Sequence, residues 1–362
     1  MPPMRRPAPS LGAFFAAGLV LAGCGAASSD DGGSDAAQDT SAGGVALATT
    51  TMLGSVVGDI MECAGGTAQT LMPIGADPHD FSASSEQVAA LVDADLVVAN
   101  GLGLEEGLAD ALEGAEADGA TVMEVAPMVN PIEFAGGGHS HDEHSHEGEE
   151  HSHEDKADGE EHSEEEHSHE GEEHAHEEDE EHAHEHGSMD PHFWHDTARM
   201  AEAAELIGAE LAEVTGDDAY ATCGTEVHDA LMKTDEQVRD ILAGVPAEKQ
   251  VLVTDHDAFG YFAQAYDFEV AGVVIPGGST LAEPSSAELA ELVEVIEAGG
   301  VPAIFSNTAD SSALVGAVAA EAGTQVEVVE LYVGSLGPEG SGADTYSGMV
   351  TTNAQLIADA LS

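Results

Sequence analysis

Basic side chains are scarce in this sequence of 362 residues: seven lysines and arginines stand against seventy-one aspartates and glutamates, for a formal net charge of −64. A chain this acidic repels phosphate groups, so nucleic acid and anionic lipid headgroups are not expected as electrostatic partners. The same charge attracts cations. The composition therefore directs attention to side chains that bind metal ions.

Common catalytic and nucleotide-binding motifs are also missing. The sequence has no HEXXH, no nucleophile elbow and no GxGxxG, the patterns that carry metalloprotease, α/β-hydrolase and dinucleotide chemistry. A zinc hydrolase would further need an open ligand position and a general base beside a substrate cleft. We therefore expect a binding protein rather than an enzyme, and keep a zinc hydrolase as the alternative of a different class.

Long apolar runs are missing outside the N-terminal region. The run at residues 11–21 follows two arginines and is too short to span a bilayer as a stable helix. It ends in LAGC (21–24), which resembles the lipobox of bacterial lipoproteins and implies cleavage before Cys24 and lipidation of its thiol. We expect a lipoprotein signal peptide at 1–23, a flexible tether at 24–44, and a mature protein anchored by lipid outside the bacterial cell membrane. The alternative is an ordinary secretory signal with an incidental cysteine.

Cysteine is rare as well: besides Cys24 the chain has only Cys63 and Cys223. Outside the cytoplasm such a pair can oxidise to a disulfide, and two separately buried thiols are the alternative. Proximity cannot be read from the sequence, so both interpretations stay open.

Strand-like and helix-like segments alternate along most of the chain. Runs typical of strands, separated by helical patterns, occur at 45–51, 67–75, 95–100, 120–125, 250–254, 268–274, 302–306 and 325–333. This alternation favours parallel sheets covered by helices on both faces. We predict an α/β fold of two parallel-sheet lobes joined by a single long helix: an N-terminal lobe at 45–215, a linker helix at 216–246 and a C-terminal lobe at 247–362.

A low-complexity insert at residues 137–187 interrupts the N-terminal lobe. It holds fourteen histidines among twenty-two acids and repeats HSHEGEE at 144–150 and 167–173. This composition cannot bury enough surface to fold. Its imidazoles suit metal collection, with an acidic spacer as the alternative. The expected weak metal ligands are His139, His141, His144, His146, His151, His153, His167, His169, His174, His176, His182, His184 and His186.

Four other side chains share one property, because each lies just after a predicted strand or in the loop that follows one. They are His79 in GADPHDF, His192 in DPHFWHD, His256 in TDHDAFGYF and Asp344 in GADTYSGM. Parallel α/β sheets bind ligands beyond the carboxyl ends of their strands, so these residues would meet in a cleft between the lobes. Three imidazoles and one carboxylate complete a tetrahedral shell for Zn(II), and the aspartate of each DPH tripeptide can orient the ring. A single histidine at such a place is more often an ordinary hydrogen-bonded residue.

The motifs together resemble the solute-binding proteins of zinc and manganese ABC importers, in particular the high-affinity zinc uptake binding proteins. The resemblance runs from about Val45 to the C-terminus and rests on GADPHDFSASSEQVAALVDADLVVANGLGLE (75–105), DPHFWHD, TDHDAFGYFAQAYDFEVAGV (254–273), EPSSAELAEL (283–292) and DTYSGMVTTN (344–353). It implies two α/β lobes joined by one rigid helix, with a metal buried between them. Its ligand positions carry over to His79, His192, His256 and Asp344.

The third ligand position separates the two metals within this family. Manganese-specific relatives tend to have a carboxylate there, so His256 and the histidine-rich insert look like the zinc branch. Many relatives also have a glutamate soon after the strand that reads AIFSN here, where this chain has Ser306 and Asn307. This departure leaves water or Glu283 as alternatives to Asp344 for the fourth ligand.

The resemblance implies that the protein captures extracytoplasmic Zn(II) and delivers it to the membrane permease of a zinc ABC importer; we expect a monomer. One alternative is a binding protein for manganese or another divalent metal. Another is an extracellular metal buffer or adhesin whose insert does the work. The importer model alone requires one tight site that persists without residues 137–187.

Comparison of the full-length protein with a variant lacking residues 137–187 tests what the insert does. An ordered cage has its ligands in place, whereas a flexible HxH pair loses backbone entropy for each ion that it holds. We expect the variant to keep one tightly bound Zn(II) and to lose several weakly bound ions. The weak capacity should vanish between about pH 7 and pH 5.5, because exposed imidazoles protonate near pH 6.5. Equal stoichiometry of the two proteins in isothermal titration at pH 7.5 would show that the insert is a spacer.

Overall fold

The structure, a computed structural model, describes residues 44–134, 189–309, 313–323 and 326–362. All of them belong to one compact unit, Ala42–Ser362. The expected signal peptide, the lipidation site Cys24 and the expected weak metal ligands of the insert lie outside the described residues. Within those described ranges, no helix combines the length and the apolar character needed to cross a membrane.

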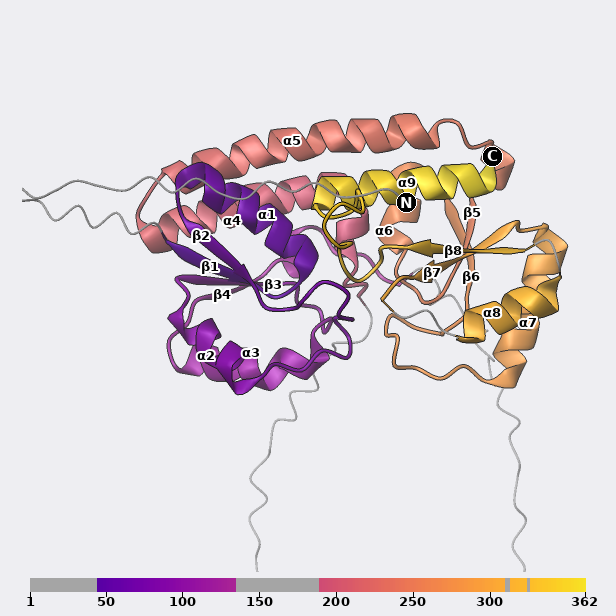
Figure 1. Ribbon diagram of the computed structural model, residues 1–362, viewed down its shortest axis with the longest axis horizontal. Helices are drawn as coiled ribbons and strands as arrows, with labels where there is room; N and C mark the ends of the chain where they lie inside the picture. The colour runs from indigo at the N-terminus through magenta and orange to yellow at the C-terminus, as the bar shows by residue number, and fades with distance from the viewer. Residues whose placement is uncertain (1–43, 135–188, 310–312, 324–325) are drawn as a thin grey trace, which may run out of the picture. The chain divides into compact units, whose positions relative to one another are not determined.

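The first half of the chain forms a four-stranded parallel sheet in the order β2-β1-β3-β4. Its strands are β1 (Val45–Ala48), β2 (Thr67–Thr70), β3 (Leu96–Ala99) and β4 (Val122–Glu124). Helix α1 (Thr51–Ala64) covers one face, and helices α2 (Ser85–Asp93) and α3 (Ala109–Ala117) cover the other (Figure 1). Alternate strand residues serve the two faces, because Ala46 and Ala48 pack in the core with α1 whereas Leu47 packs with Leu91 of α2.

The second half repeats this arrangement in a parallel sheet of order β6-β5-β7-β8. Its strands are β5 (Val251–Thr254), β6 (Glu269–Val273), β7 (Ala303–Asn307) and β8 (Glu327–Leu331), and its helices are α6 (Gly260–Tyr266), α7 (Ser286–Gly299) and α8 (Ala313–Ala322). Helices α2 and α7, which follow the corresponding edge strands, both begin with a capping box, Ser84 with Gln87 and Ser285 with Glu288. The predicted fold of two parallel α/β lobes is confirmed.

Three further helices pack in a core shared with both sheets: α4 (Thr197–Thr215), α5 (Ala219–Leu242) and α9 (Tyr346–Leu361). Helix α5 packs against α4, α1 and α9 (Figure 1). One hydrophobic core accordingly contains side chains of both sheets, such as Val98 of β3 and Leu252 of β5. A disulfide between Cys63 and Cys223, whose Cα atoms are 5.8 Å apart, joins α1 to α5. Short 3₁₀ turns occur at η1 (Glu106–Leu108), η2 (Ala126–Met128), η3 (Phe193–His195) and η4 (Ala247–Lys249).

Helices α4 and α5 approach each other closely where two glycines meet. A Cβ atom on Gly208 would lie 2.7 Å from Cα of Gly224 and 2.7 Å from the carbonyl oxygen of Tyr220. A Cβ atom on Gly224 would lie 2.8 Å from the carbonyl oxygen of Ala204. Helical backbone cannot swing aside as the end of a long side chain can. The two glycines therefore set the distance between α4 and α5.

The substitution Gly224→Ala should force α4 and α5 apart and lower the free energy of unfolding by about 1–3 kcal/mol, the usual cost of overpacking. Gly58→Ala in α1 is the matched control, because a Cβ atom there has no neighbour within 4 Å. Alanine is the better helix former by up to about 1 kcal/mol. Urea denaturation of the two variants should therefore shift in opposite directions, and equal destabilisation of both would contradict the packing argument.

Candidate metal centre

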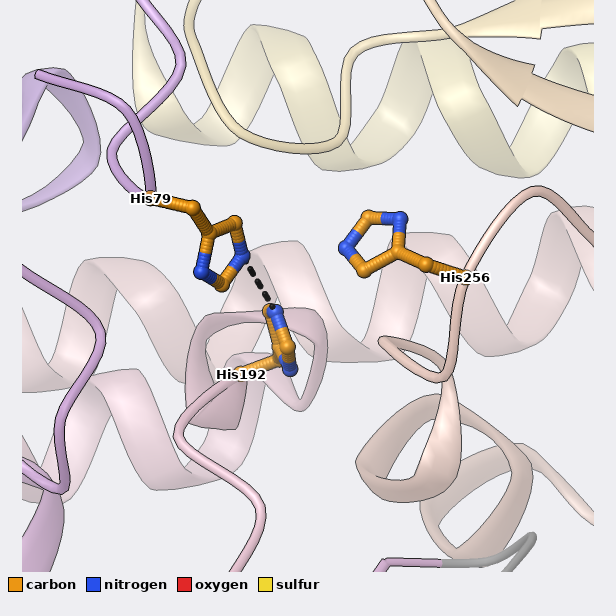
Figure 2. A group of neighbouring side chains, drawn as sticks. All are labelled: His79, His192 and His256. Atoms are coloured by element: carbon orange, nitrogen blue, oxygen red, sulfur yellow. Dashed lines mark hydrogen bonds between the residues drawn. The ribbon is translucent and has the colours of Figure 1, made fainter. Parts of the chain in front are cut away.

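Three buried imidazole rings meet between the lobes. His79, His192 and His256 offer nitrogen atoms that all lie within 4.8 Å of one another, and Figure 2 shows the rings reaching toward one another from three separate segments. His79 lies in the loop between β2 and α2, His192 directly precedes η3, and His256 follows β5. The three residues are 5%, 1% and 2% exposed. A cation held here would be removed from bulk water.

The two DPH tripeptides form the same local turn. Oδ1 of Asp77 accepts a hydrogen bond from the backbone N–H of His79 at 3.0 Å, and Oδ1 of Asp190 accepts one from that of His192 at 2.9 Å. Each carboxylate thereby fixes the backbone two residues on, in the manner of an Asx turn. Oδ2 of Asp77 also accepts from the hydroxyl of Thr280 at 2.7 Å. This bond ties the first lobe to the second beside the cluster.

Carboxylates also orient two of the three rings. Oδ1 of Asp190 lies 2.7 Å from Nδ1 of His192, and Oδ1 of Asp255 lies 2.9 Å from Nδ1 of His256. A proton held on Nδ1 leaves the lone pair of Nε2 free for a metal ion. Nε2 of His192 lies 3.3 Å from Nε2 of His79 (Figure 2). Two nitrogens bound tetrahedrally to one zinc ion at about 2.0–2.1 Å stand about 3.3–3.4 Å apart, so the observed spacing fits a shared ion.

Burial changes the protonation of these rings. It lowers the pKa of His79 to about 4, with a smaller effect from the neighbouring His256, and it lowers the pKa of His192 well below 6.5. Burial alone would lower the pKa of His256, but the charge and the hydrogen bond of Asp255, together with the charges of Asp77 and Asp190, raise that pKa. His79 and His192 are therefore neutral at neutral pH, which is the form of imidazole that binds metal.

The structure does not bring Asp344 to this cluster. Asp344 is exposed, and its Oδ2 accepts a hydrogen bond from the backbone N–H of Gly340 at 3.1 Å. The part of the loop after β8 that lies against the first DPH turn is Gly334, where a Cβ atom would lie 3.0 Å from Cδ of Pro78. The expected alternative, Glu283, is also exposed. Among the residues that the structure describes, the cluster consists of imidazoles alone.

Sequence reasoning missed one residue that shapes the centre, Asp255, although the segment TDHD places it directly beside His256. Asp255 is held in turn by Asn307, whose backbone N–H donates to its Oδ2 at 2.8 Å. Asn307 stands where many relatives were expected to have a glutamate soon after the strand. Of the DPH aspartates, Asp190 contacts the ring of its own histidine as expected, whereas Asp77 binds backbone and a hydroxyl.

Residues 47–360 match the model of the family described as zinc-uptake complex component A, periplasmic. The chain belongs to this family. It is a metal-binding substrate-binding protein of an ABC importer, as the resemblance of its motifs implied.

Relatives of this family member are named for two different metals. The chain is 26% identical over 349 residues to the manganese-binding lipoprotein MntA of Halalkalibacterium halodurans, with 95% of each chain covered. It is 29% identical over 337 residues to the zinc-binding protein TroA of Treponema pallidum, covering 90% of this chain and 92% of that one. The solved structure of the periplasmic zinc binding protein TroA from Treponema pallidum is similar with a TM-score of 0.69 and 26% identity, over 88% of this chain and 99% of that chain. Family membership thus establishes metal binding and leaves the metal open.

The lowered pKa of His79 predicts an acid-sensitive contribution to stability. Because this pKa is lower in the folded state than in the unfolded chain, the unfolded chain binds more protons below about pH 6.5. The contribution of His79 to the free energy of unfolding therefore decreases as the pH falls from about 6.5 toward 4. We expect ¹⁵N NMR of the metal-free protein to show neutral rings for His79 and His192 at about pH 5.5.

A His79→Gln variant provides the control for this effect. Its urea midpoint should fall less between about pH 7 and pH 5 than that of the unchanged protein, because one buried titrating ring is gone. Protonation of the His79 ring near pH 6.5 in the NMR titration would contradict the burial argument.

Proposed function

We propose that the protein captures Zn(II) outside the cytoplasmic membrane and delivers it to the permease of a zinc ABC importer. The observation that carries this proposal is the cluster of three buried imidazoles. Among the described residues, no carboxylate belongs to this cluster as a further metal ligand. Imidazole nitrogen suits zinc, copper and nickel, whereas manganese and magnesium prefer carboxylate, carbonyl and water oxygens. Of these metals, zinc also accepts the tetrahedral arrangement that the 3.3 Å spacing of two ligand nitrogens fits.

Water is the fourth ligand in this proposal. A tetrahedral zinc ion needs one donor beyond the three imidazoles, and both Asp344 and Glu283 are exposed away from the cluster. A water ligand alone does not make a hydrolase, which also needs a general base next to that water. Two carboxylates beside the rings, Asp190 and Asp255, lie within hydrogen-bond distance of Nδ1 of His192 and His256. These contacts support a carrier rather than a catalyst.

The N-terminal sequence and the relatives support the cellular location that we propose. LAGC supports a lipid anchor on Cys24, and several relatives are named lipoproteins. We propose a monomer held at the outer side of the cytoplasmic membrane, whose histidine-rich insert collects metal for the buried centre. Manganese is the competing cargo, because relatives with similar identity are named for it.

Single substitutions at the three imidazoles test the centre. His79→Ala, His192→Ala and His256→Ala should each weaken tight Zn(II) binding at least 100-fold, because each removes one ligand from a preformed cage. His228→Ala is the matched control: this histidine lies on α5, with Nδ1 3.2 Å from Asp229 and outside the cluster. Isothermal titration of variants that also lack residues 137–187 removes the background from the insert. Undiminished tight binding in any of the three cluster variants would exclude the site.

Competition between metals tests the cargo. The metal-free protein, given equal amounts of Zn(II) and Mn(II), should retain zinc, and metal analysis after gel filtration measures this. His256→Glu should lower the preference for zinc over manganese, because it replaces a nitrogen donor with oxygen. Retention of manganese by the unchanged protein would assign the alternative cargo.

A further inference from the structure

A cavity of about 170 Å³ adjoins the metal centre on one side. Of the three clustered histidines, His79 alone contributes to its lining, and His79 is also the most exposed of the three. The other lining groups include the apolar side chains of Leu102, Phe134, Met189 and Pro191. His79 is therefore the ligand that faces this cavity, whereas His192 and His256 lie deeper.

Phe134 closes one side of this cavity by crossing from the first lobe to the second. A Cβ atom on Gly278 would lie 2.1 Å from both Cε1 and Cζ of Phe134. The ring thus occupies the space that any other residue type at 278 would need for its side chain. Gly278 and Thr280 belong to the same loop after β6, and Thr280 donates its hydroxyl to Asp77 in the DPH turn of His79.

Hydrogen bonds hold the backbone of the segment that precedes Phe134, at Val129 and at Ile132. The guanidinium of Arg199 donates to the carbonyl oxygen of Val129 at 2.7 Å. The hydroxyl of Tyr261 accepts from the backbone N–H of Ile132 at 3.2 Å. Phe134 itself is half-buried. These contacts hold the backbone before Phe134, and the ring of Phe134 packs against the backbone of Gly278 in the other lobe.

Leu102, another apolar residue of the lining, has a strained backbone. It has φ 54° between Gly101 and Gly103, whose φ angles are 83° and 78°. A leucine in this left-handed region is disfavoured, and such strain concentrates at functional sites. The buried carboxylate of Glu105 holds the turn by accepting the backbone N–H of Asn100 at 2.7 Å and that of Gly101 at 3.1 Å.

We propose that Phe134, together with Leu102, forms a gate that controls how fast the metal ion enters and leaves the centre. This inference rests on the proposed function of the three-histidine site. Apolar constrictions oppose the passage of hydrated ions, and neither side chain offers a donor atom to the bound metal. The gate therefore changes the barrier between the free and bound states and leaves the two end states nearly unchanged.

The single tryptophan of the chain provides a reporter for this test. The ring of Trp194 lies 5.2 Å from that of His192, centroid to centroid, so its fluorescence should respond to Zn²⁺ in the buried centre. In stopped-flow experiments on the full-length protein, Zn²⁺ alone measures capture and excess EDTA measures release. Phe134→Ala should raise both rates at least fivefold and change Kd less than twofold. Phe134→Leu should lie between the alanine variant and the unchanged protein.

Two further variants separate a gate from a general loss of structure. Leu102→Gly removes the second apolar side chain while suiting the left-handed backbone, so it should also raise both rates. Met128→Ala is the control, because Met128 is 50% exposed and does not line the cavity; its rates should not change. Unchanged rates in Phe134→Ala, or a faster release matched by an equal loss of affinity, would overturn the gate.

The outcomes also separate the gate from the proposed function. If Zn²⁺ changes the fluorescence of the unchanged protein and His79→Ala abolishes that change, the metal site stands whatever the Phe134 variants do. If the unchanged protein binds no Zn²⁺ at this centre, the proposed cargo and the gate both fail.

Discussion

Three imidazole rings packed together away from water are the constraint on which the other features of the centre depend. Burial removes solvation from any protonated ring, and His79 and His192 consequently have lowered pKa values. The Nε2 atoms of these two rings lie 3.3 Å apart, within hydrogen-bond distance, and the same spacing fits two nitrogen ligands of one shared cation. Asp190 and Asp255 hold two of the rings with the correct nitrogen facing inward.

The fold meets this constraint by bringing together three segments: the loop after β2 with His79, the turn before η3 with His192, and the loop after β5 with His256. Both sheets have the same strand order, and both direct the loops after their strands toward the centre. The relative position of the lobes then decides whether the rings meet. Helices α4, α5 and α9 share one core with both sheets, and the disulfide joins α1 to α5. Gly208 and Gly224 allow α4 and α5 to pack at close distance.

Capture and retention make different demands on the same site. A carrier that holds its ion tightly must still accept and surrender it, and deep burial of all ligands slows both steps. The cavity beside His79 offers access on one side, and the apolar side chains of Phe134 and Leu102 restrict it. Affinity then depends on the imidazoles and their carboxylate partners, while rates depend on side chains that never touch the metal.

Much of this arrangement could be predicted from the sequence. Strand and helix patterns repeat regularly enough to indicate two parallel α/β lobes, and the structure confirms them. The DPH tripeptides and the TDHD segment mark His79, His192 and His256 in the sequence, and parallel α/β sheets bind ligands beyond the carboxyl ends of their strands. Such local signals need no knowledge of distant contacts.

Other features were decided only by tertiary structure. The loop from β8 to α9 is long, so its position after a strand does not tell which of its residues lies near the metal centre. In the structure Gly334 lies beside the first DPH turn, whereas Asp344 is exposed. Cys63 and Cys223 are 160 residues apart in sequence, and helix packing alone makes them neighbours. The contact of Phe134 with Gly278 likewise joins segments of two lobes. Local sequence determines which chemical groups each loop can offer, whereas long-range packing determines which of them meet.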